Sequence, residues 1–383
     1  MTTGHVRRRG KRSWEIKFEL EADALTGKRH IRYASFKGTK REAELELARL
    51  VAKNASGEGV DPSKSTVAEF VERWVRDWAA ANVSLKTLEQ YRGLLRLHVS
   101  PHIGAIRIQK LRPVHLNELY SALLRGKDGQ PLSARSVGHV HRVLHRALGH
   151  AATWGVVSQN VASLVAPPPV PGSEIAILTE EQIGIILRHL EGRALRPIVS
   201  FLLGTGARRG EALALRWGDV NFQKNVVRIE RSLEQTKGSL RVKEPKTRNG
   251  RRNVTISPWL AAELRAHRAR QDERRLSLGL GRSPEDAPVF ARWNGEVRSP
   301  SRLSQDFTAA MNTLQINCTL HGLRHTHVSQ LIANGLDVLT ISRRIGHASP
   351  AITLNVYSHM FSNTDARAAE IMEATFANVR STD

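Results

Sequence analysis

Two stretches rich in proline, glycine and small polar residues constrain this chain most, because they divide its 383 residues into three parts. Residues 58–65 lie within the turn-forming sequence GEGVDPSKS. Residues 166–174, APPPVPGSE, form a proline-rich linker, which is stiff rather than flexible. The sequence therefore predicts domains at residues 1–60, 66–165 and 175–383, a number that suits a chain of this length.

The first part has the pattern of a small sheet braced by one helix. In SWEIKFEL, apolar residues alternate with polar ones, as in a half-buried strand: Trp14, Ile16, Phe18 and Leu20. A turn at Thr26-Gly27 leads to a returning strand in HIRYASFK, and KREAELELARLVAK has the pattern of an amphipathic helix. We expect a three-stranded sheet plus a helix. Its basic face suits DNA, although a purely structural module with a solvated face fits the same pattern.

The second part is predicted to be all-α. Thr66 and Glu69 form a capping-box pattern at the start of the helix VAEFVERWVRDWAA. Three further helices are expected to begin near Ser84, Pro113 and Ser133. We expect Pro101 to stop the second helix. The histidines of this part have mixed spacings that give no metal-ligand set, so a solvated or DNA-facing polar surface is the better interpretation.

The third part is predicted to be mainly helical with a small antiparallel sheet. Thr179 and Gln182 form another capping box, and helical patterns continue to about Trp217. Three strand-like runs follow, NVVRIERS, SLRVKEP and RRNVTIS, and the dipeptide Asn249-Gly250 predicts a hairpin between the last two. Helices are expected from Pro258 onward. The complete chain is thus predicted to have a multidomain α+β fold.

The excess of positive charge indicates which class of molecule this protein binds. Lys and Arg number 58 against 36 Asp and Glu, a net charge of +22. A protein this basic usually meets a polyanion, although a basic proteome or a membrane surface would also account for the charge. No stretch has the length and apolarity of a membrane span, and no apolar segment of a secretory signal follows the basic start. The single cysteine, Cys318, excludes an intrachain disulfide and a cysteine-based metal cluster, so a reducing cytoplasm is the simplest compartment.

Four segments of the third part carry residues suited to phosphate chemistry. They are TGARRGEALALRW (205–217), the expected hairpin, HGLRHTHVSQLI (321–332) and RRIGHASPAITLNVYSHM (343–360). Arg208 stands at a helix start, a natural place for an anion, while His321 and Arg324 are spaced to face the same way. Taken singly, each such residue is more often a solvated charge or part of the core.

Taken in order, the series resembles the tyrosine recombinase (phage integrase) family. The family's six active-site positions fall on Arg208, Lys246, His321, Arg324, His347 and Tyr357. Lys243 on the same expected hairpin competes with Lys246 for the lysine position. Ile345 departs from the leucine that the family commonly has before Gly-His, which affects no catalytic position. Residues 66–165 resemble the family's core-binding domain more loosely, and residues 1–60 resemble its small arm-binding domain.

The resemblance implies a reaction that needs no ATP, cofactor or metal. Tyr357 would attack a DNA phosphodiester, giving a 3′-phosphotyrosyl enzyme and a free 5′-hydroxyl. Arg208, Arg324 and His347 would neutralise the phosphate oxygens in place of metal ions. His321 would act as the general base and Lys246 as the acid that protonates the leaving oxygen.

The implied partner is double-stranded DNA at core-type and arm-type sites. The expected contacts are Arg7, Arg8, Arg9, Lys11, Arg12, Arg92, Arg142, Arg209 and Arg248. We also expect a tetramer on DNA, accessory DNA-bending or directionality proteins, action in the cytoplasm of a bacterial cell, and no membrane. The amphipathic tail after Tyr357 would pack on its own domain or on a neighbouring subunit. A type IB topoisomerase-like enzyme and a DNA-binding regulator with a decayed active site are the alternatives.

Overall fold

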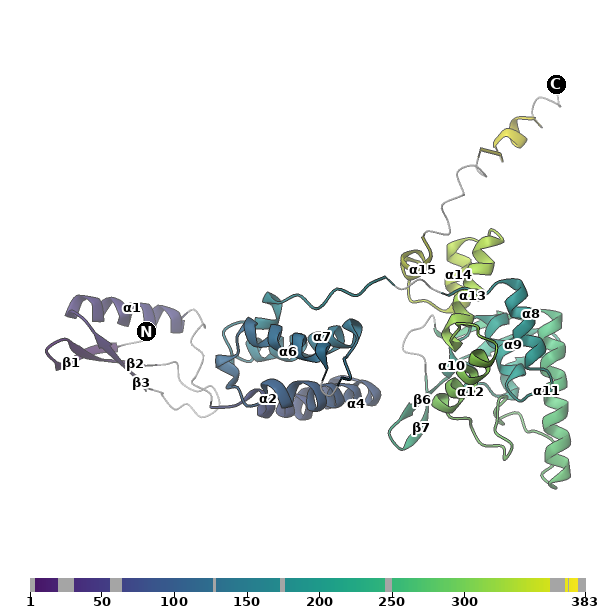
Figure 1. Ribbon diagram of the computed structural model, residues 1–383, viewed down its shortest axis with the longest axis horizontal. Coiled ribbons are helices and arrows are strands. Elements are labelled where there is room, and N and C mark those ends of the chain that lie inside the picture. Colours follow the sequence, from purple (N-terminus) through teal and green to yellow (C-terminus); the bar gives the residue numbers. More distant parts are fainter. Residues whose placement is uncertain are drawn as a thin grey trace. The chain divides into compact units, whose positions relative to one another are not determined.

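The computed structural model describes residues 4–19, 31–55, 64–126, 129–172, 176–244, 250–358, 369–370 and 372–377. They belong to two compact units, Met1–Gly172 and Ser173–Asp383, called here the N-terminal and C-terminal units (Figure 1). The predicted multidomain α+β fold is confirmed, since helices dominate and the sheets are small and antiparallel. None of the described helices is long and apolar enough to cross a bilayer.

The N-terminal unit begins with an antiparallel sheet in the order β1-β2-β3. Its elements are β1 (Gly4–Gly10), β2 (Ser13–Glu19), β3 (Ile31–Lys37) and α1 (Lys40–Ala55). The alternation predicted for β2 is present, because Ile16 and Phe18 are buried. Trp14 Nε1 donates to the carbonyl oxygen of Gly38 at 3.0 Å, which ties the sheet to the segment before α1. Leu20 and the turn predicted at Thr26-Gly27 lie outside the described residues.

The rest of the N-terminal unit is helical, and its main helices begin where the sequence predicts helix starts. Its elements are α2 (Val67–Trp74), η1 (Val75–Ala79), α3 (Ala80–Asn82), α4 (Leu85–Leu94), η2 (Leu95–Val99), α5 (Ser100–Ile103), η3 (Ile108–Lys110), α6 (Pro113–Arg125), α7 (Ala134–Thr153) and η4 (Val161–Leu164). Thr66 and Glu69 form both bonds of a capping box, and Ser84 and Ser133 each accept a backbone N–H. These caps satisfy amides that a helix start leaves without partners.

The prediction that Pro101 stops the second helix is wrong. The helix passes through a π-helical turn, η2, and continues as α5 to Ile103. Proline lacks a backbone N–H and its ring collides with the carbonyl four residues earlier in a regular α-helix. The wider π-helical turn directly before Pro101 changes that spacing, so the chain keeps its helical direction.

Two histidines of this helical region serve its packing. Trp74 is fully buried, and its Nε1 donates to His150 Nδ1 at 2.7 Å. His141 is also buried, with its Nδ1 2.8 Å from the hydroxyl of Tyr120. Among the residues that the structure describes, no group of three or more His, Cys, Asp or Glu could hold a metal ion.

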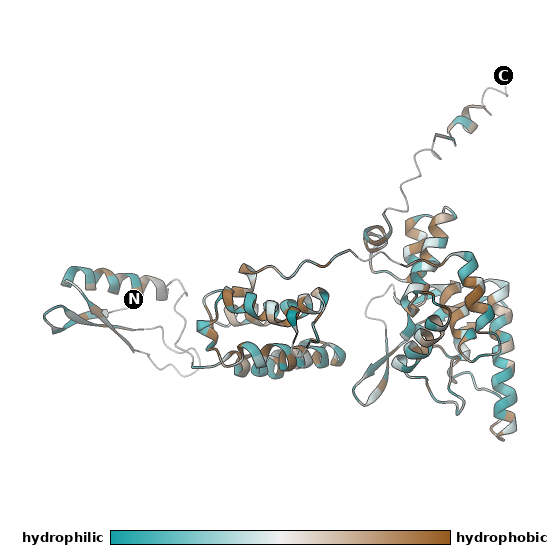
Figure 2. Cartoon of the chain, in the orientation of Figure 1, coloured by the Kyte–Doolittle hydropathy of each residue, from teal (hydrophilic) through white to brown (hydrophobic). Residues whose placement is uncertain are grey.

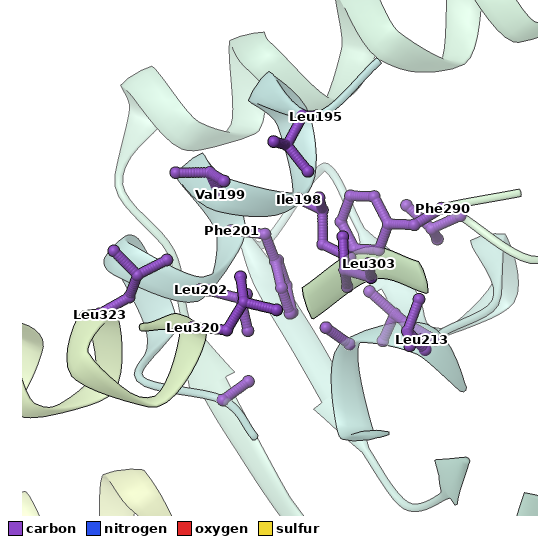
Figure 3. Packing of buried hydrophobic residues seen from close by; sticks show 14 of the residues in the cluster. Leu195, Ile198, Val199, Phe201, Leu202, Leu213, Phe290, Leu303, Leu320 and Leu323 are labelled. Atoms are coloured by element: carbon purple, nitrogen blue, oxygen red, sulfur yellow. The ribbon is translucent and has the colours of Figure 1, made fainter. Parts of the chain in front are cut away.

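The C-terminal unit is built around α9. Its elements are α8 (Glu180–His189), α9 (Arg196–Thr205), α10 (Arg209–Leu213), η5 (Trp217–Asp219), β4 (Val220–Asn221), β5 (Val226–Ile229), β6 (Ser232–Thr236), β7 (Ser239–Lys243), β8 (Arg252–Thr255), α11 (Pro258–Ser277), α12 (Pro300–Thr313), α13 (Leu320–Ala333), α14 (Val338–Ile345) and α15 (Pro350–Tyr357). Helix α9 is strongly apolar, and its Phe201 and Leu202 are fully buried among residues of neighbouring helices, including Leu303 and Leu323 (Figures 2 and 3). This packing holds the C-terminal end of α9 in place.

The predicted hairpin between SLRVKEP and RRNVTIS is wrong. Strand β7 pairs with β6, whereas β8 pairs with β5 in a second sheet of order β4-β5-β8. The register places Val227 opposite Val254, and both are buried in the core. Strand β7 has no such apolar face, because Leu240 and Val242 are both exposed. Burial of β8 against β5 therefore decides the pairing, rather than the Asn249-Gly250 dipeptide.

Candidate active site

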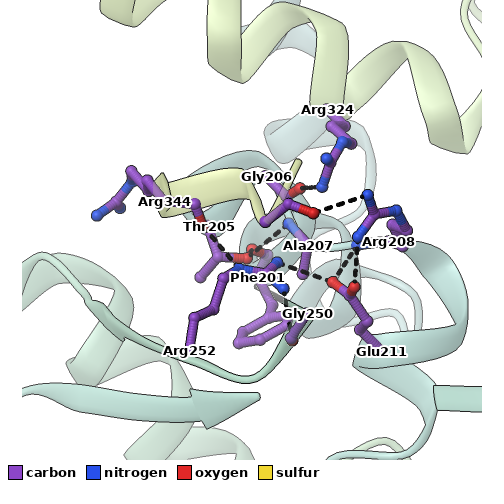
Figure 4. Close-up of polar contacts among 11 residues, drawn as sticks. Phe201, Thr205, Gly206, Ala207, Arg208, Glu211, Gly250, Arg252, Arg324 and Arg344 are labelled. Atoms are coloured by element: carbon purple, nitrogen blue, oxygen red, sulfur yellow. Dashed lines mark hydrogen bonds and ion pairs between the residues drawn. The ribbon is translucent and has the colours of Figure 1, made fainter. Parts of the chain in front are cut away.

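The two arginines predicted for the active site, Arg208 and Arg324, each donate a hydrogen bond to the carbonyl oxygen of a glycine that ends a helix. Gly206 ends α9 and Gly346 ends α14, both in the left-handed conformation that favours glycine. Arg324 donates to the carbonyl oxygen of Gly206 at 2.6 Å (Figure 4). Arg208 donates to the carbonyl oxygen of Gly346 at 3.1 Å. The carbonyl end of a helix carries partial negative charge, so each helix end stabilises one guanidinium.

Space as well as backbone angle requires glycine at position 206. A Cβ atom there would lie 2.6 Å from the ring of His327 and 3.1 Å from Ile345. His327 is itself fixed, since its Nδ1 lies 2.7 Å from the carbonyl oxygen of Leu203. The sequence TGARRG therefore places Arg208 two residues after a turn that only glycine can make.

A buried carboxylate supports this arrangement. Glu211 of α10 binds Arg208 Nη1 at 2.8 Å through one oxygen and Arg252 Nη2 at 2.8 Å through the other (Figure 4). Burial raises the pKa of Glu211, but the hydrogen bond from Arg252 and the charges of both arginines outweigh burial and lower it overall. Glu211 is therefore an anion that positions the arginines, and its two oxygens are occupied.

A second pair of arginines, Arg252 and Arg344, connects the site to α14 through hydrogen bonds. Arg252 donates from Nε to the carbonyl oxygen of Arg344 at 2.7 Å. Arg344 in turn donates to His327 Nε2 at 3.1 Å and to the carbonyl oxygen of Gly204 at 3.1 Å. Sequence reasoning missed Glu211, Arg252, Arg344 and His327 as parts of the site. Only the position of Glu211, three residues after Arg208, gave any indication of such a role.

Arg324 retains an unused donor. Only 3% of this residue is exposed, and its Nη2 is buried with no hydrogen-bond partner in the described part of the chain. Buried polar atoms are nearly always paired, because leaving one unpaired costs about 1–3 kcal/mol. Burial and the charge of Arg208 lower the pKa of Arg324. An anion bound here would satisfy the free N–H and offset the repulsion between the two cations.

Both predicted histidines lie beside these arginines. Desolvation by its neighbours lowers the pKa of His321 to about 4, and the proximity of His325, Arg324 and Arg208 lowers it further, while part of the residue stays exposed on α13. Burial, followed by the charges of the arginines, also lowers the pKa of His347 to about 4. The Nδ1 of His347 lies 2.9 Å from Thr353 Oγ1, which orients its ring. Both rings are therefore neutral at pH 7.

Tyr357 ends α15 next to this cluster. Its side chain is 2% exposed, and burial raises its pKa to about 12 despite the nearby charge of Arg324. The hydroxyl of Tyr357 lies 2.5 Å from Nδ1 of His325. Sequence reasoning assigned the general base to His321 and missed His325. The four-residue spacing of these two histidines on α13 was the available indication, because residues i and i+4 lie on one helix face.

The other candidate residues are placed as follows. Lys246 and Arg248 lie outside the described residues. Arg209 is partly buried and donates to Ser304 Oγ, whereas Lys243, the competing lysine, is paired with Glu234. The remaining candidates for DNA contact are exposed: Arg7, Arg8, Arg9, Lys11, Arg12, Arg92 and Arg142. Arg9 pairs with Glu15, and Arg142 lies 2.9 Å from His139 Nδ1.

Comparisons with known proteins find similar integrases and recombinases. A profile of the phage integrase family matches residues 176–364, and one of the phage integrase N-terminal SAM-like domain matches residues 66–124. A tyrosine recombinase XerC-like protein of Caldanaerobacter subterraneus is 26% identical over 365 residues, covering 90% of this chain and 92% of that protein. An integrase of Streptomyces ambofaciens is 29% identical over 360 residues, covering 92% and 90% respectively.

Solved structures show the same fold. The Tn1549 transposon integrase, in complex with a circular intermediate DNA, superposes with a TM-score of 0.68 at 20% identity, covering 80% of this chain and 100% of that one. A lambda integrase dimer bound to a core site superposes with a TM-score of 0.57 at 16% identity, covering 93% and 94%.

Proposed function

The chain belongs to the tyrosine recombinase (phage integrase) family of site-specific DNA recombinases, and we propose that it cuts and rejoins DNA through Tyr357. The buried, unpaired Nη2 of Arg324 is the observation that carries this proposal. It belongs to a site with two guanidinium groups, two neutral histidines and a buried phenol. Such a site can bind an anion that accepts several hydrogen bonds, and a DNA phosphodiester is such an anion.

In the proposed first step, Tyr357 Oη attacks the phosphorus and the bond to the 5′-oxygen breaks. Arg208 and Arg324 bind the non-bridging oxygens through planar donor groups that match phosphate geometry, and His347 adds one donor. Lys246 gives the leaving 5′-oxygen its proton. A 5′-hydroxyl of another strand then reverses the chemistry, and the phosphotyrosyl bond conserves the energy of the broken linkage.

The proposed organisation follows the same family pattern. Residues 1–60 bind arm-type DNA sites, residues 66–165 bind core sites and residues 175–383 carry the chemistry. Integration and excision of mobile-element DNA are supported by the integrases among the relatives. A tetramer on DNA is supported by the lambda integrase tetramer bound to a Holliday junction, a protein of the same fold. Accessory DNA-bending or directionality proteins and a cytoplasmic location remain part of the proposal.

A nicked suicide substrate tests the reaction. The full-length protein should become covalently attached to the 3′ end of the cut strand, and Tyr357→Phe should abolish the adduct while retaining DNA binding. Tyr33→Phe is a matched control, because it removes an exposed phenol from β3 and should leave the adduct intact. Attachment that persists in Tyr357→Phe would exclude Tyr357 as the nucleophile.

A further inference from the structure

The hydroxyl of Tyr357 and Nδ1 of His325 lie 2.5 Å apart, with ring centroids 5.7 Å apart. We propose that His325 is a further catalytic residue, which accepts the proton of Tyr357 as the tyrosine attacks DNA. This inference rests on the proposed function, and it assigns to His325 the base role that the family resemblance gives to His321.

The placement of the two histidines separates their roles. His321 and His325 lie one turn apart on α13, with ring centroids 4.7 Å apart and planes at 87°. Solvent exposure decreases from His321, which is exposed, through His325, which is intermediate, to Tyr357, which is buried. His321 is thus the member that incoming DNA can reach, while His325 contacts the atom that must lose a proton. A general base needs hydrogen-bonding contact with that proton.

The protonation state of His325 suits an acceptor. Burial and the adjacent charge of Arg324 lower its pKa, so the ring is neutral at pH 7 and Nδ1 can accept the phenolic O–H. Among the residues that the structure describes, the titratable groups that contact it besides Arg324 are His321 on the same helix and Tyr357 on α15. A bound phosphodiester would bring a negative charge against Arg324. That charge offsets the cation and makes His325 a stronger proton acceptor at the moment of attack.

The proton and electron pairs balance in both directions. As the bond from Tyr357 Oη to phosphorus forms, its O–H proton moves to Nδ1 of His325 and the bond from phosphorus to the 5′-oxygen breaks. The leaving oxygen takes a proton from a separate acid, which the proposed function assigns to Lys246. In the reverse step, a 5′-hydroxyl attacks and gives its proton to the deprotonated Lys246, the phosphotyrosyl bond breaks, and protonated His325 returns its proton to the phenolate.

Single-turnover cleavage of the suicide substrate by full-length His325→Ala and His325→Gln tests the proposal. We expect the rate constant to fall about 100-fold or more at pH 7, with DNA affinity nearly unchanged. The loss should shrink as pH rises, because hydroxide can then replace the base. Added imidazole should restore cleavage by His325→Ala, whereas a substrate with a 5′-bridging sulfur should not, since sulfur relieves the need for an acid only.

His321→Ala, one turn earlier on α13, is the competing variant. Imidazole rescue of His321→Ala in place of His325→Ala would overturn the proposal, as would a wild-type rate and pH profile in both His325 variants. Those results would leave Tyr357 as the nucleophile, because the wild-type adduct would still form. Absence of the adduct from the wild type would overturn the proposed function as well.

A spectroscopic measurement covers the case in which both His325 variants fail to fold. The imidazole ¹⁵N resonances of wild-type protein are compared with those of Tyr357→Phe, which removes only the phenolic oxygen. The proposal expects one neutral histidine, His325, whose hydrogen-bonded Nδ1 resonance shifts in Tyr357→Phe. Unchanged histidine resonances in Tyr357→Phe would overturn it.

Discussion

Two groups of arginines in the C-terminal unit show how differently the same residue type is used. One group surrounds Glu211 and the ends of α9 and α14: Arg208, Arg252, Arg324 and Arg344. The other lies along α11, whose outer half is strongly hydrophilic in Figure 2: Arg265, Arg268, Arg270, Arg274 and Arg275. The first group is bound to backbone carbonyls and a buried carboxylate. In the second group Arg265, Arg270 and Arg274 are exposed, and Arg268 pairs with Glu285, whose side chain is 69% exposed.

The comparison indicates that the burial of an arginine and its partner, rather than the number of arginines, decides how much each one contributes to the stability of the fold. Charges in water are screened, and exposed pairs contribute about 0–1 kcal/mol. Removing one partner of a buried pair leaves a charge without compensation, which costs about 3–5 kcal/mol. The two groups should therefore respond to substitution by very different amounts.

The largest expected difference is in stability. Glu211→Gln should lower the free energy of unfolding by about 3–5 kcal/mol, because Arg208 and Arg252 lose their shared buried anion. Glu285→Gln removes the exposed partner of Arg268 and should cost less than about 1 kcal/mol. Urea unfolding of both variants measures the contrast. Equal losses would mean that the network around Glu211 does not stabilise the fold.

Catalysis should distinguish the groups almost as strongly. Arg324→Ala is expected to slow covalent-adduct formation about 10²–10³-fold, as when one preorganised donor to a reacting oxyanion is removed. Arg324→Lys keeps a positive charge and loses the planar donor group, so its rate should lie between those of Arg324→Ala and the wild type. Single-turnover cleavage at saturating DNA gives the rates. A wild-type rate in Arg324→Ala would show that this residue does not bind the reacting phosphate.

Acid should destabilise the C-terminal unit through its buried histidines. The folded-state pKa values of His327 and His347 are about 4, below the ordinary 6.5, so the unfolded chain binds more protons between these values. The contribution of these rings to stability is therefore complete above pH 6.5 and falls as pH drops toward 4, by at most about 3 kcal/mol for each ring. Unfolding free energies across this range measure the slope. A flat profile would show that these rings are not held neutral.

The smallest effect is expected on α11. Arg270 and Arg274 are exposed, so changing either to Ala should shift stability by less than about 0.5 kcal/mol. The rate of adduct formation at saturating DNA should not change, because neither residue belongs to the cluster around Arg324. Urea unfolding and single-turnover cleavage test both statements. A tenfold loss of cleavage would contradict the division between the two groups.

Local patterns in the sequence determined much of this protein. The helix starts at Ser84, Ser133 and Thr179 follow from side chains that cap backbone amides within three residues. The order of motifs from Arg208 to Tyr357 indicated the family, and the profile matches bear it out. These features are readable because each depends on residues that are neighbours in the chain or on a pattern already known.

Tertiary structure decided what depends on residues far apart in the chain. Strand β8 pairs with β5 because both carry apolar side chains into the core, which the dipeptide Asn249-Gly250 does not reveal. Glu211 joins Arg252, forty-one residues later, and Tyr357 meets His325 rather than His321. A sequence lists several acids, arginines and histidines with similar spacing. Only packing, which sets burial and distance together, selects the partners among them.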